Sequence, residues 1–294
     1  MNYADLLERA WRNLWRHPIL WIFGILQGCQ TFNYGFNIDQ AGAQRTLTML
    51  ERWIDEPIVA LALVIFSLSI FFFLLVSQLV GVAGTIRTTM LAEKGEERIS
   101  LALIFADGWR DFWRLLGLRF LWVALWFFLF IISFAPVVVL LLILHIEEIV
   151  LVIFVAVLAF LCLFLPLLLV LIPFIAISSS AVVLEKMGFW RSFLQGWRVY
   201  VRNFGRLLLF LLILVLLRIG VVFPLAFLVA LLPIPPLLYL AFVFPFGLAF
   251  FGGVNAFIQS AWTLAYLRLR PLPEEAAGTS LPLSPQPASN VLET

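Results

Sequence analysis

Residues that could carry out acid–base, nucleophilic or metal chemistry are few in this chain and far apart. The two histidines, His17 and His145, lie in different segments and cannot serve one site. The acidic pairs Glu96-Glu97 and Glu147-Glu148 lie in polar links, where a solvated turn is the simpler explanation. There is no H-E-x-x-H motif and no glycine-rich phosphate loop with its lysine. The sequence therefore predicts a protein that is not an enzyme and that needs no metal or cofactor.

One charged residue is notable because it lies deep inside an apolar run. Arg218 has no acidic residue near it in any apolar segment. If the last span returns antiparallel, Asn255 lies at a similar depth and Gln259 one turn nearer the cytoplasm. One hypothesis is a polar cavity in which these three residues hold an anionic group, such as a lipid phosphate or a small carboxylate. The alternative is a structural arginine that binds backbone carbonyls at the breaks near Pro224 or Pro245.

A tryptophan–arginine pattern occurs three times. Its members are Trp11, Arg12 and Arg16; Trp109, Arg110 and Arg114; and Trp197, Arg198 and Arg202. In each copy apolar residues recur every three or four positions, so they share one face of a helix and the arginines lie on another. Such a helix is typical of the membrane–water interface, with rings towards the acyl chains and guanidinium groups towards anionic headgroups.

Two interpretations of these three copies remain open. The first is an anchor that sets the depth of the neighbouring helices, which we favour because interfacial tryptophan and arginine are common without a further role. The second is a docking surface for lipid headgroups or for a partner protein. Both make membrane lipids, and anionic lipids in particular, the expected partners.

The elements that carry these residues are apolar enough to place the chain in a membrane. Hydrophobic residues make up 64% of the sequence, charged residues only 12%, and the mean hydropathy is +1.08. The formal net charge of +2 and the absence of longer lysine–arginine blocks argue against a nucleic-acid partner. We expect an all-α polytopic membrane protein with six transmembrane helices. They span about 18–36, 58–84, 115–144, from 149 towards 186, 207–232 and 237–267.

The three copies divide the membrane domain, residues 1–270, into three units in parallel orientation. The units are about 1–97, 98–187 and 188–270, and each consists of an amphipathic interfacial helix followed by two spans. Residues 271–294 are rich in Pro, Ser, Glu and Ala without an apolar period, which predicts a disordered tail.

The distribution of basic residues predicts the orientation of the chain. Arginines and lysines concentrate before the first span and in the links that carry the other two copies, whereas the alternate links hold only Arg45 and Arg52. By the positive-inside rule both termini and all three copies lie in the cytoplasm, in a multi-pass protein of the cell (inner) membrane. Arg119 lies near the cytoplasmic end of the third span, where its side chain can reach the surface.

Small residues predict where helices pack closely. Gly24 and Gly28 form a G-x-x-x-G pair in the first span, although this spacing also arises by chance. In the second span, small residues recur about one turn apart, which predicts a helix–helix seam. They are Ser77, Gly81, Thr85 and Thr88. This helix should continue past the bilayer and end at Gly95.

Several short motifs resemble those of a known group. They are Gly-Trp-Arg before the third and fifth spans, Leu184-Glu185-Lys186-Met187-Gly188-Phe189, and Ser260-Ala261-Trp262-Thr263-Leu264-Ala265-Tyr266. With them, residues 1 to about 270 resemble uncharacterised bacterial six-span membrane proteins, including the membrane domain attached to some glycerophosphodiester phosphodiesterases. The resemblance includes no hydrolase motif, so it implies no phosphodiesterase activity.

These observations predict a non-catalytic integral membrane protein, a scaffold or accessory subunit that engages anionic lipid or a partner protein in the membrane. The alternative is a transporter or lipid-handling permease with an anion-binding cavity at Arg218. A continuous polar lining across the membrane would favour transport, and a closed interior would favour the scaffold.

Overall fold

The computed structural model describes residues 2–28, 57–96, 99–144, 158, 165–231 and 239–270. Every regular element in these ranges is a helix, which confirms the predicted all-α class for the described chain. The elements are α1 (Tyr3–Arg16), α2 (Ile19–Gly28), α4 (Pro57–Glu93), α5 (Leu101–Leu144), α7 (Leu165–Glu185), α8 (Phe189–Arg202), α9 (Phe204–Leu231), the π-helical turn η2 (Tyr239–Val243) and α11 (Phe244–Leu269).

Four of these helices are long and apolar enough to cross a membrane. They cover Pro57–Glu93, Leu101–Ile132, Phe204–Leu225 and Ala241–Leu269 and correspond to the second, third, fifth and sixth predicted spans. The first and fourth predicted spans are represented by the shorter apolar helices Ile19–Gly28 and Leu171–Glu185. Residues 29–36 of the first predicted span, residues 149–157 and 159–164 of the fourth, and the predicted tail, 271–294, lie outside the described residues.

Helix α4 ends as the sequence predicts. It continues without a break from Pro57 to Glu93, and Gly95 follows with a φ of 82°, a left-handed conformation that favours glycine. Helix α5 then begins directly after Ser100, whose carbonyl accepts a hydrogen bond from the Ile104 N–H at 3.2 Å.

The second tryptophan–arginine copy differs from the prediction of three separate interfacial helices. The first copy forms the separate helix α1 and the third forms the separate helix α8, but the second is the first part of the continuous helix α5. Pro18 disfavours helical geometry at His17, which ends α1, and Asn203 separates α8 from α9. Between Arg114 and Leu118 the chain has neither proline nor asparagine, so the helix continues.

The centre of the molecule is the place where the C-terminal parts of α4, α7 and α11 pack against one another. Small and hydroxyl side chains lie there, and Thr88, Ser180 and Ser260 are completely buried. The Thr89 hydroxyl donates a hydrogen bond to Ser260 Oγ at 2.9 Å. Because these side chains are short, the three helices can approach closely.

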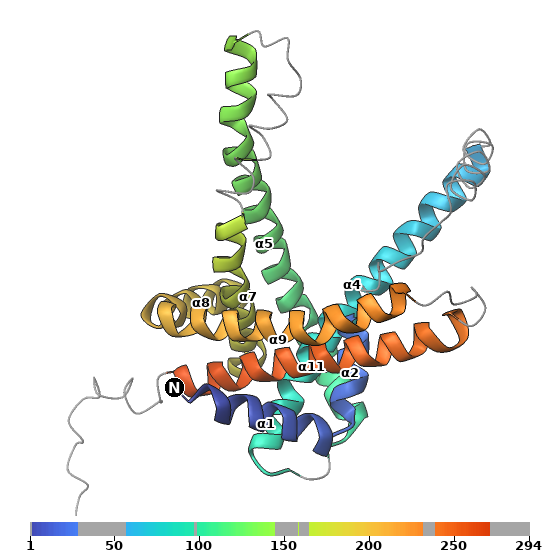
Figure 1. Cartoon of the computed structure of the whole chain (residues 1–294), viewed down its shortest axis with the longest axis vertical. Coiled ribbons are helices and arrows are strands. Elements are labelled where there is room, and N and C mark those ends of the chain that lie inside the picture. The colour runs from blue at the N-terminus through green and yellow to red at the C-terminus, as the bar shows by residue number, and fades with distance from the viewer. Residues whose placement is uncertain are drawn as a thin grey trace, which may run out of the picture.

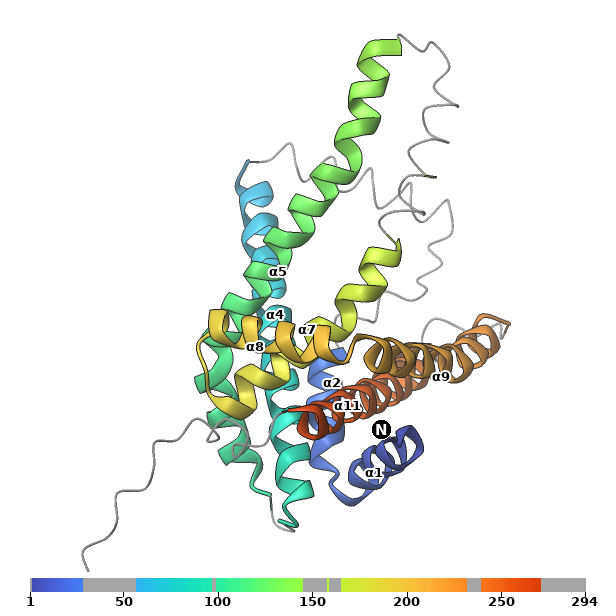
Figure 2. The same ribbon diagram turned by 90° about the vertical axis from the view of Figure 1, so that its left-hand side faces the viewer.

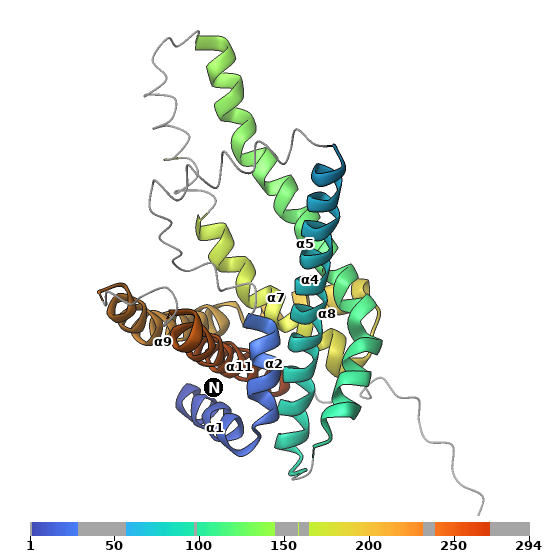
Figure 3. The ribbon, with the colours of Figure 1, turned by 90° about the vertical axis from the view of Figure 1, so that its right-hand side faces the viewer.

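Glycines allow α2 to cross its two neighbours at short range. A Cβ at Gly24 would lie 2.1 Å from the Gly252 carbonyl oxygen of α11, and one at Gly81 would lie 2.7 Å from the Phe23 carbonyl oxygen. Both distances are impossible for a real side chain, so only glycine fits. The close-packing interpretation of Gly24 and of the small-residue face of α4 is therefore confirmed. Figure 3 shows α2 beside α4 at this crossing.

The helices spread outward from this centre in different directions. Figure 1 shows α4 and α5 diverging, while α9 and α11 run side by side across the direction of α5. Figure 2 shows α8 folded back along α7. The start of α1 lies next to the end of α11, so segments from the two ends of the described chain are neighbours.

Candidate functional site

The three tryptophan–arginine copies share one burial pattern. The tryptophans are half-exposed: Trp11 is 55%, Trp109 51% and Trp197 50% exposed. Three positions later each copy has a buried side chain, and one position earlier it has a buried small residue. The buried side chains are Leu14, Phe112 and Tyr200, and the small residues are Ala10, Gly108 and Gly196.

The buried side of each copy packs against the C-terminal half of an apolar helix. A Cβ at Gly108 would lie 3.6 Å from a Val80 methyl of α4, and one at Gly196 would lie 2.2 Å from Ser178 Oγ of α7. Helix α1 packs against α11, with the Trp11 ring 6.2 Å from the Phe257 ring. The three copies are thus fixed to the same three helix ends that form the centre of the fold.

The predicted aromatic face does not turn outward as a whole. Phe112 and Tyr200 belong to the protein core, and the Phe174 ring of α7 contacts the rings of Trp197 and Tyr200 at 5.5 and 5.8 Å. Burial raises the pKa of the Tyr200 hydroxyl to about 12, so this hydroxyl stays neutral at physiological pH. Only the tryptophan side of each copy is available to a lipid or a partner.

The predicted arginines lie near these exposed indoles on the outside of the molecule. Arg12, Arg16, Arg110, Arg198 and Arg202 are exposed, and Arg114 is half-buried. Two of the pattern's arginines also form ion pairs within their own helix. Arg12 approaches Glu8 at 3.6 Å and Arg114 approaches Asp111 at 3.4 Å. In such an arrangement the indole rings can lie at the boundary between headgroups and acyl chains, and the guanidinium groups can bind an anionic headgroup.

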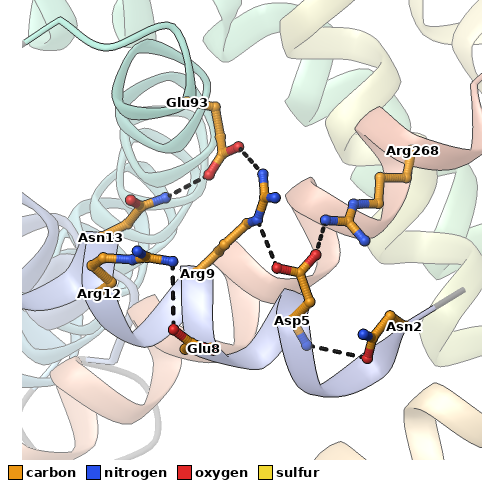
Figure 4. Close-up of polar contacts among 8 residues, drawn as sticks. All are labelled: Asn2, Asp5, Glu8, Arg9, Arg12, Asn13, Glu93 and Arg268. Carbon is orange, nitrogen blue, oxygen red and sulfur yellow. Dashed lines mark hydrogen bonds and ion pairs between the residues drawn. The ribbon is translucent and has the colours of Figure 1, made fainter.

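Helix α1 also carries a charged contact that joins the two ends of the described chain (Figure 4). Asp5 accepts hydrogen bonds from Arg268 of α11 and, at 3.0 Å, from Arg9. Glu93, the last residue of α4, accepts from Arg9 at 3.4 Å and from Asn13 at 3.2 Å. Helix α1 therefore links the end of α11 to the end of α4.

The arginines of this contact set the charge state of its carboxylate. The hydrogen bond from Arg268, followed by the one from Arg9, lowers the pKa of Asp5 below its usual 3.8, and Asp5 in turn raises the pKa of Arg9. Sequence reasoning missed this contact. The only local signal was the i, i+4 spacing of Asp5 and Arg9, because Glu93 and Arg268 are distant in sequence.

A second charged cluster joins α4 to the start of α5. Arg87 donates to Asp107 and, at 2.7 Å, to Asp111, which is almost completely buried. Arg114 approaches the other oxygen of Asp111 at 3.4 Å. The sequence interpretation counted Arg87 only as a basic charge of a link. The spacing of Asp107 and Asp111, one turn apart on one helix face, was the signal that could have identified its partner.

The three residues of the predicted anion cavity do not share one environment. Arg218 is exposed on α9, whereas Gln259 is buried in α11 with its Nε2 donating to no acceptor in the described chain. Asn255 is half-buried beside Gly28 of α2, with its Nδ2 atom 3.1 Å from the position of a Cβ there. An exposed arginine and a buried amide do not line one closed cavity, and anion binding by Arg218 stays a prediction.

Metal chemistry has no obvious location in the described residues. No group of three or more His, Cys, Asp or Glu side chains that could hold a metal ion occurs among them. The charged residues that do cluster are ion pairs between carboxylates and arginines.

The apolar helices and their hydroxyl-lined centre define a helical membrane protein. A protein family described as a domain of unknown function, DUF7847, matches residues 1–290, and the chain belongs to this family. No curated protein and no solved structure matches the chain. The resemblance to membrane domains of glycerophosphodiester phosphodiesterases therefore stays a prediction.

Proposed function

We propose that this protein is a non-catalytic scaffold or accessory subunit of the cell (inner) membrane that engages anionic lipid on its cytoplasmic side. A partner protein in the membrane would use the same surface. The observation that carries the proposal is the repeated half-exposed tryptophan with arginines beside it, in α1, α5 and α8. Each arginine near an anionic membrane surface contributes on the order of 1 kcal/mol to binding.

The arrangement of the helices supports a three-unit organisation. Each copy packs against one of the three central helix ends: the second on α4, the third on α7 and the first on α11. The first copy packs on α11, the last of the described helices. Three parallel units predict this pairing of each copy with a central helix, and with it all copies and both termini on the cytoplasmic side, although α9 and α11 run across the direction of α5.

The scaffold role is favoured over transport because the hydroxyl groups at the centre are buried, and several of them form hydrogen bonds within the protein. The Thr85 and Thr263 hydroxyls donate to carbonyls one turn earlier in their own helices, at 2.8 and 2.9 Å. The Thr89 hydroxyl lies within hydrogen-bond distance of both the Thr85 carbonyl oxygen and Ser260 Oγ. The Thr88 and Ser178 hydroxyls at this centre have no hydrogen-bond partner in the described chain, but they too are completely buried and closed off from solvent. A transport path would instead need polar groups open to water across the membrane.

Tryptophan fluorescence in lipid nanodiscs tests the proposal. Nanodiscs would contain brominated phosphatidylglycerol in one sample and brominated phosphatidylcholine, at the same fraction, in the other. We expect stronger quenching by the anionic lipid, because it concentrates around the three tryptophans. The variants Trp11→Phe, Trp109→Phe and Trp197→Phe identify the fluorescence that belongs to each copy.

Arginine variants give the matched control. Replacing Arg198 and Arg202 with Gln should abolish the preference for the anionic lipid at Trp197. Replacing Arg206, an exposed arginine of α9 outside the pattern, should leave it unchanged. Equal quenching by both lipids in the unmodified protein would refute the proposed engagement of anionic lipid.

A further inference from the structure

The sequence predicts that the side chain of Arg119 reaches the surface from the cytoplasmic end of its span, but the structure places Arg119 of α5 at a packing position. It lies in the candidate span Leu101–Ile132 and is half-buried beside the buried residues Leu115, Leu118 and Trp122. In the third copy of the pattern, the same distance after the tryptophan leads to Leu207, which is completely buried in the core. Arg119 therefore replaces an apolar side chain at a packing position.

The charge of Arg119 is not balanced by the described protein. The acids nearest to it along α5 are Asp107 and Asp111, and both are already bound to Arg87, with Arg114 on the remaining oxygen of Asp111. Within the described residues Arg119 takes part in no hydrogen bond or ion pair. A guanidinium group cannot lose its proton in a protein, so Arg119 must meet either water at the membrane surface or an acceptor that is not part of the described protein.

A second donor without an acceptor lies next to it. Trp122 is only 2% exposed, and its Nε1–H has no hydrogen-bond acceptor in the described chain. Residues three positions apart are neighbours on a helix surface, so the indole N–H and the guanidinium group lie on adjacent parts of α5. A buried donor without a partner is costly, and the two donors together favour a ligand that offers several acceptor oxygens.

We propose that Arg119 and Trp122 bind a phosphate-type anion, and that its source is the headgroup of an anionic phospholipid. This inference rests on the proposed engagement of anionic lipid and assigns one specific lipid site to it. The tryptophan–arginine copies attract the lipid to the surface, and Arg119 holds one headgroup at the start of the α5 span. The phosphodiester supplies the charge that balances Arg119 and the acceptor that the Trp122 N–H lacks.

Native mass spectrometry of the full chain, purified in detergent and titrated with phosphatidylglycerol, tests the site. We expect one tightly held lipid in the unmodified protein and its loss in Arg119→Gln, with affinity reduced about tenfold or more. Arg119→Lys should bind with intermediate affinity because it keeps the charge but not the planar fork. Trp122→Phe should weaken binding less than Arg119→Gln. Arg206→Gln is the matched control, an exposed cation at nearly the same repeat position, and should bind normally.

A parallel titration with inorganic phosphate distinguishes the source of the anion. We expect no displacement of the lipid by phosphate. Displacement, or phosphate binding that is lost in Arg119→Gln, would overturn the lipid as the source and assign a soluble anion. If Arg119→Gln folds, as judged by its thermal unfolding, and still binds lipid as tightly as the unmodified protein, the site itself is excluded. Bromolipid quenching at Trp11, Trp109 and Trp197 does not depend on Arg119, so the proposed function can fail or hold independently.

Discussion

Single glycines decide how closely the helices of this protein approach one another. Gly24 faces backbone, since a Cβ there would lie 2.1 Å from the Gly252 carbonyl oxygen and 2.8 Å from the Gly252 carbonyl carbon. Backbone cannot move aside as the end of a flexible side chain can. Gly220 of α9 is the opposite case, because nothing lies within 4 Å of a Cβ there.

Gly24→Ala should therefore separate α2 from α11 and lower stability by about 1–3 kcal/mol. Gly220→Ala should be neutral or stabilise by up to about 1 kcal/mol, because alanine is the better helix former. Thermal unfolding in one detergent measures both variants. A Gly24→Ala protein that unfolds at the same temperature as Gly220→Ala would contradict the close crossing.

His17 gives the turn between α1 and α2 a dependence on pH. Burial, and then the positive charge of Arg16, lowers its pKa below the usual 6.5. Between that lowered value and 6.5 the unfolded chain binds a proton that the folded chain does not. Stability should thus be highest above pH 6.5 and decrease as the pH falls through this window. His17→Gln should remove this part of the pH dependence in unfolding measured from pH 7.5 to about 5. An unchanged pH profile in that variant would assign the effect to other groups.

At the scale of the elements, the sequence predicted most helices because the signals are local. The apolar runs, and Gly95 after α4, lie within a few residues of the helices that they determine. The separation of α1 from α2 follows from Pro18. The continuity of α5 through the second copy was missed, because the repeated pattern suggested a break that no residue there enforces.

The candidate site was harder to predict because its contacts join distant segments. Arg268 and Asp5 are at opposite ends of the described chain, and nothing local to either identifies the other. The outward aromatic face was also only partly correct. Helical spacing places Trp197 and Tyr200 on one side of α8, but packing against Phe174 then divides that side into a buried and an exposed half.

The contact between α4 and α5 depends on the buried ion pair of Arg87 with Asp111, so removal of this ion pair should lower the stability of the protein. Arg87→Leu would leave the carboxylate of Asp111, which is 1% exposed, buried without its main partner, at a cost of about 3–5 kcal/mol. The exposed Arg110→Leu should change stability by no more than about 0.5 kcal/mol. Unfolding in detergent measures both. The double variant Arg87→Leu with Asp111→Leu should recover much of the loss, since no buried charge then remains, and equal losses in single and double variants would argue against the ion pair as the cause.

At the scale of the whole molecule, the charged contacts place several helix ends on one side. Glu93 of α4 binds α1, Glu185 of α7 accepts a hydrogen bond from Tyr266 of α11, and Arg268 of α11 binds α1. The C-terminal ends of α4, α7 and α11 are therefore neighbours. A chain whose central helices end together must return to the other side between them, which is the connectivity expected of parallel units.

Accessibility to a membrane-impermeant thiol reagent tests this orientation. Single cysteines would replace the exposed residues Arg12, Arg110 and Arg198, one from each copy, after Cys29 and Cys162 are changed to Ser. We expect all three to remain unlabelled in intact cells and to react in inverted membrane vesicles, because the positive-inside rule places every copy in the cytoplasm. A cysteine in the outer link, such as Arg45→Cys, should show the reverse and serves as the control. Labelling of one copy from the opposite side would contradict the three parallel units.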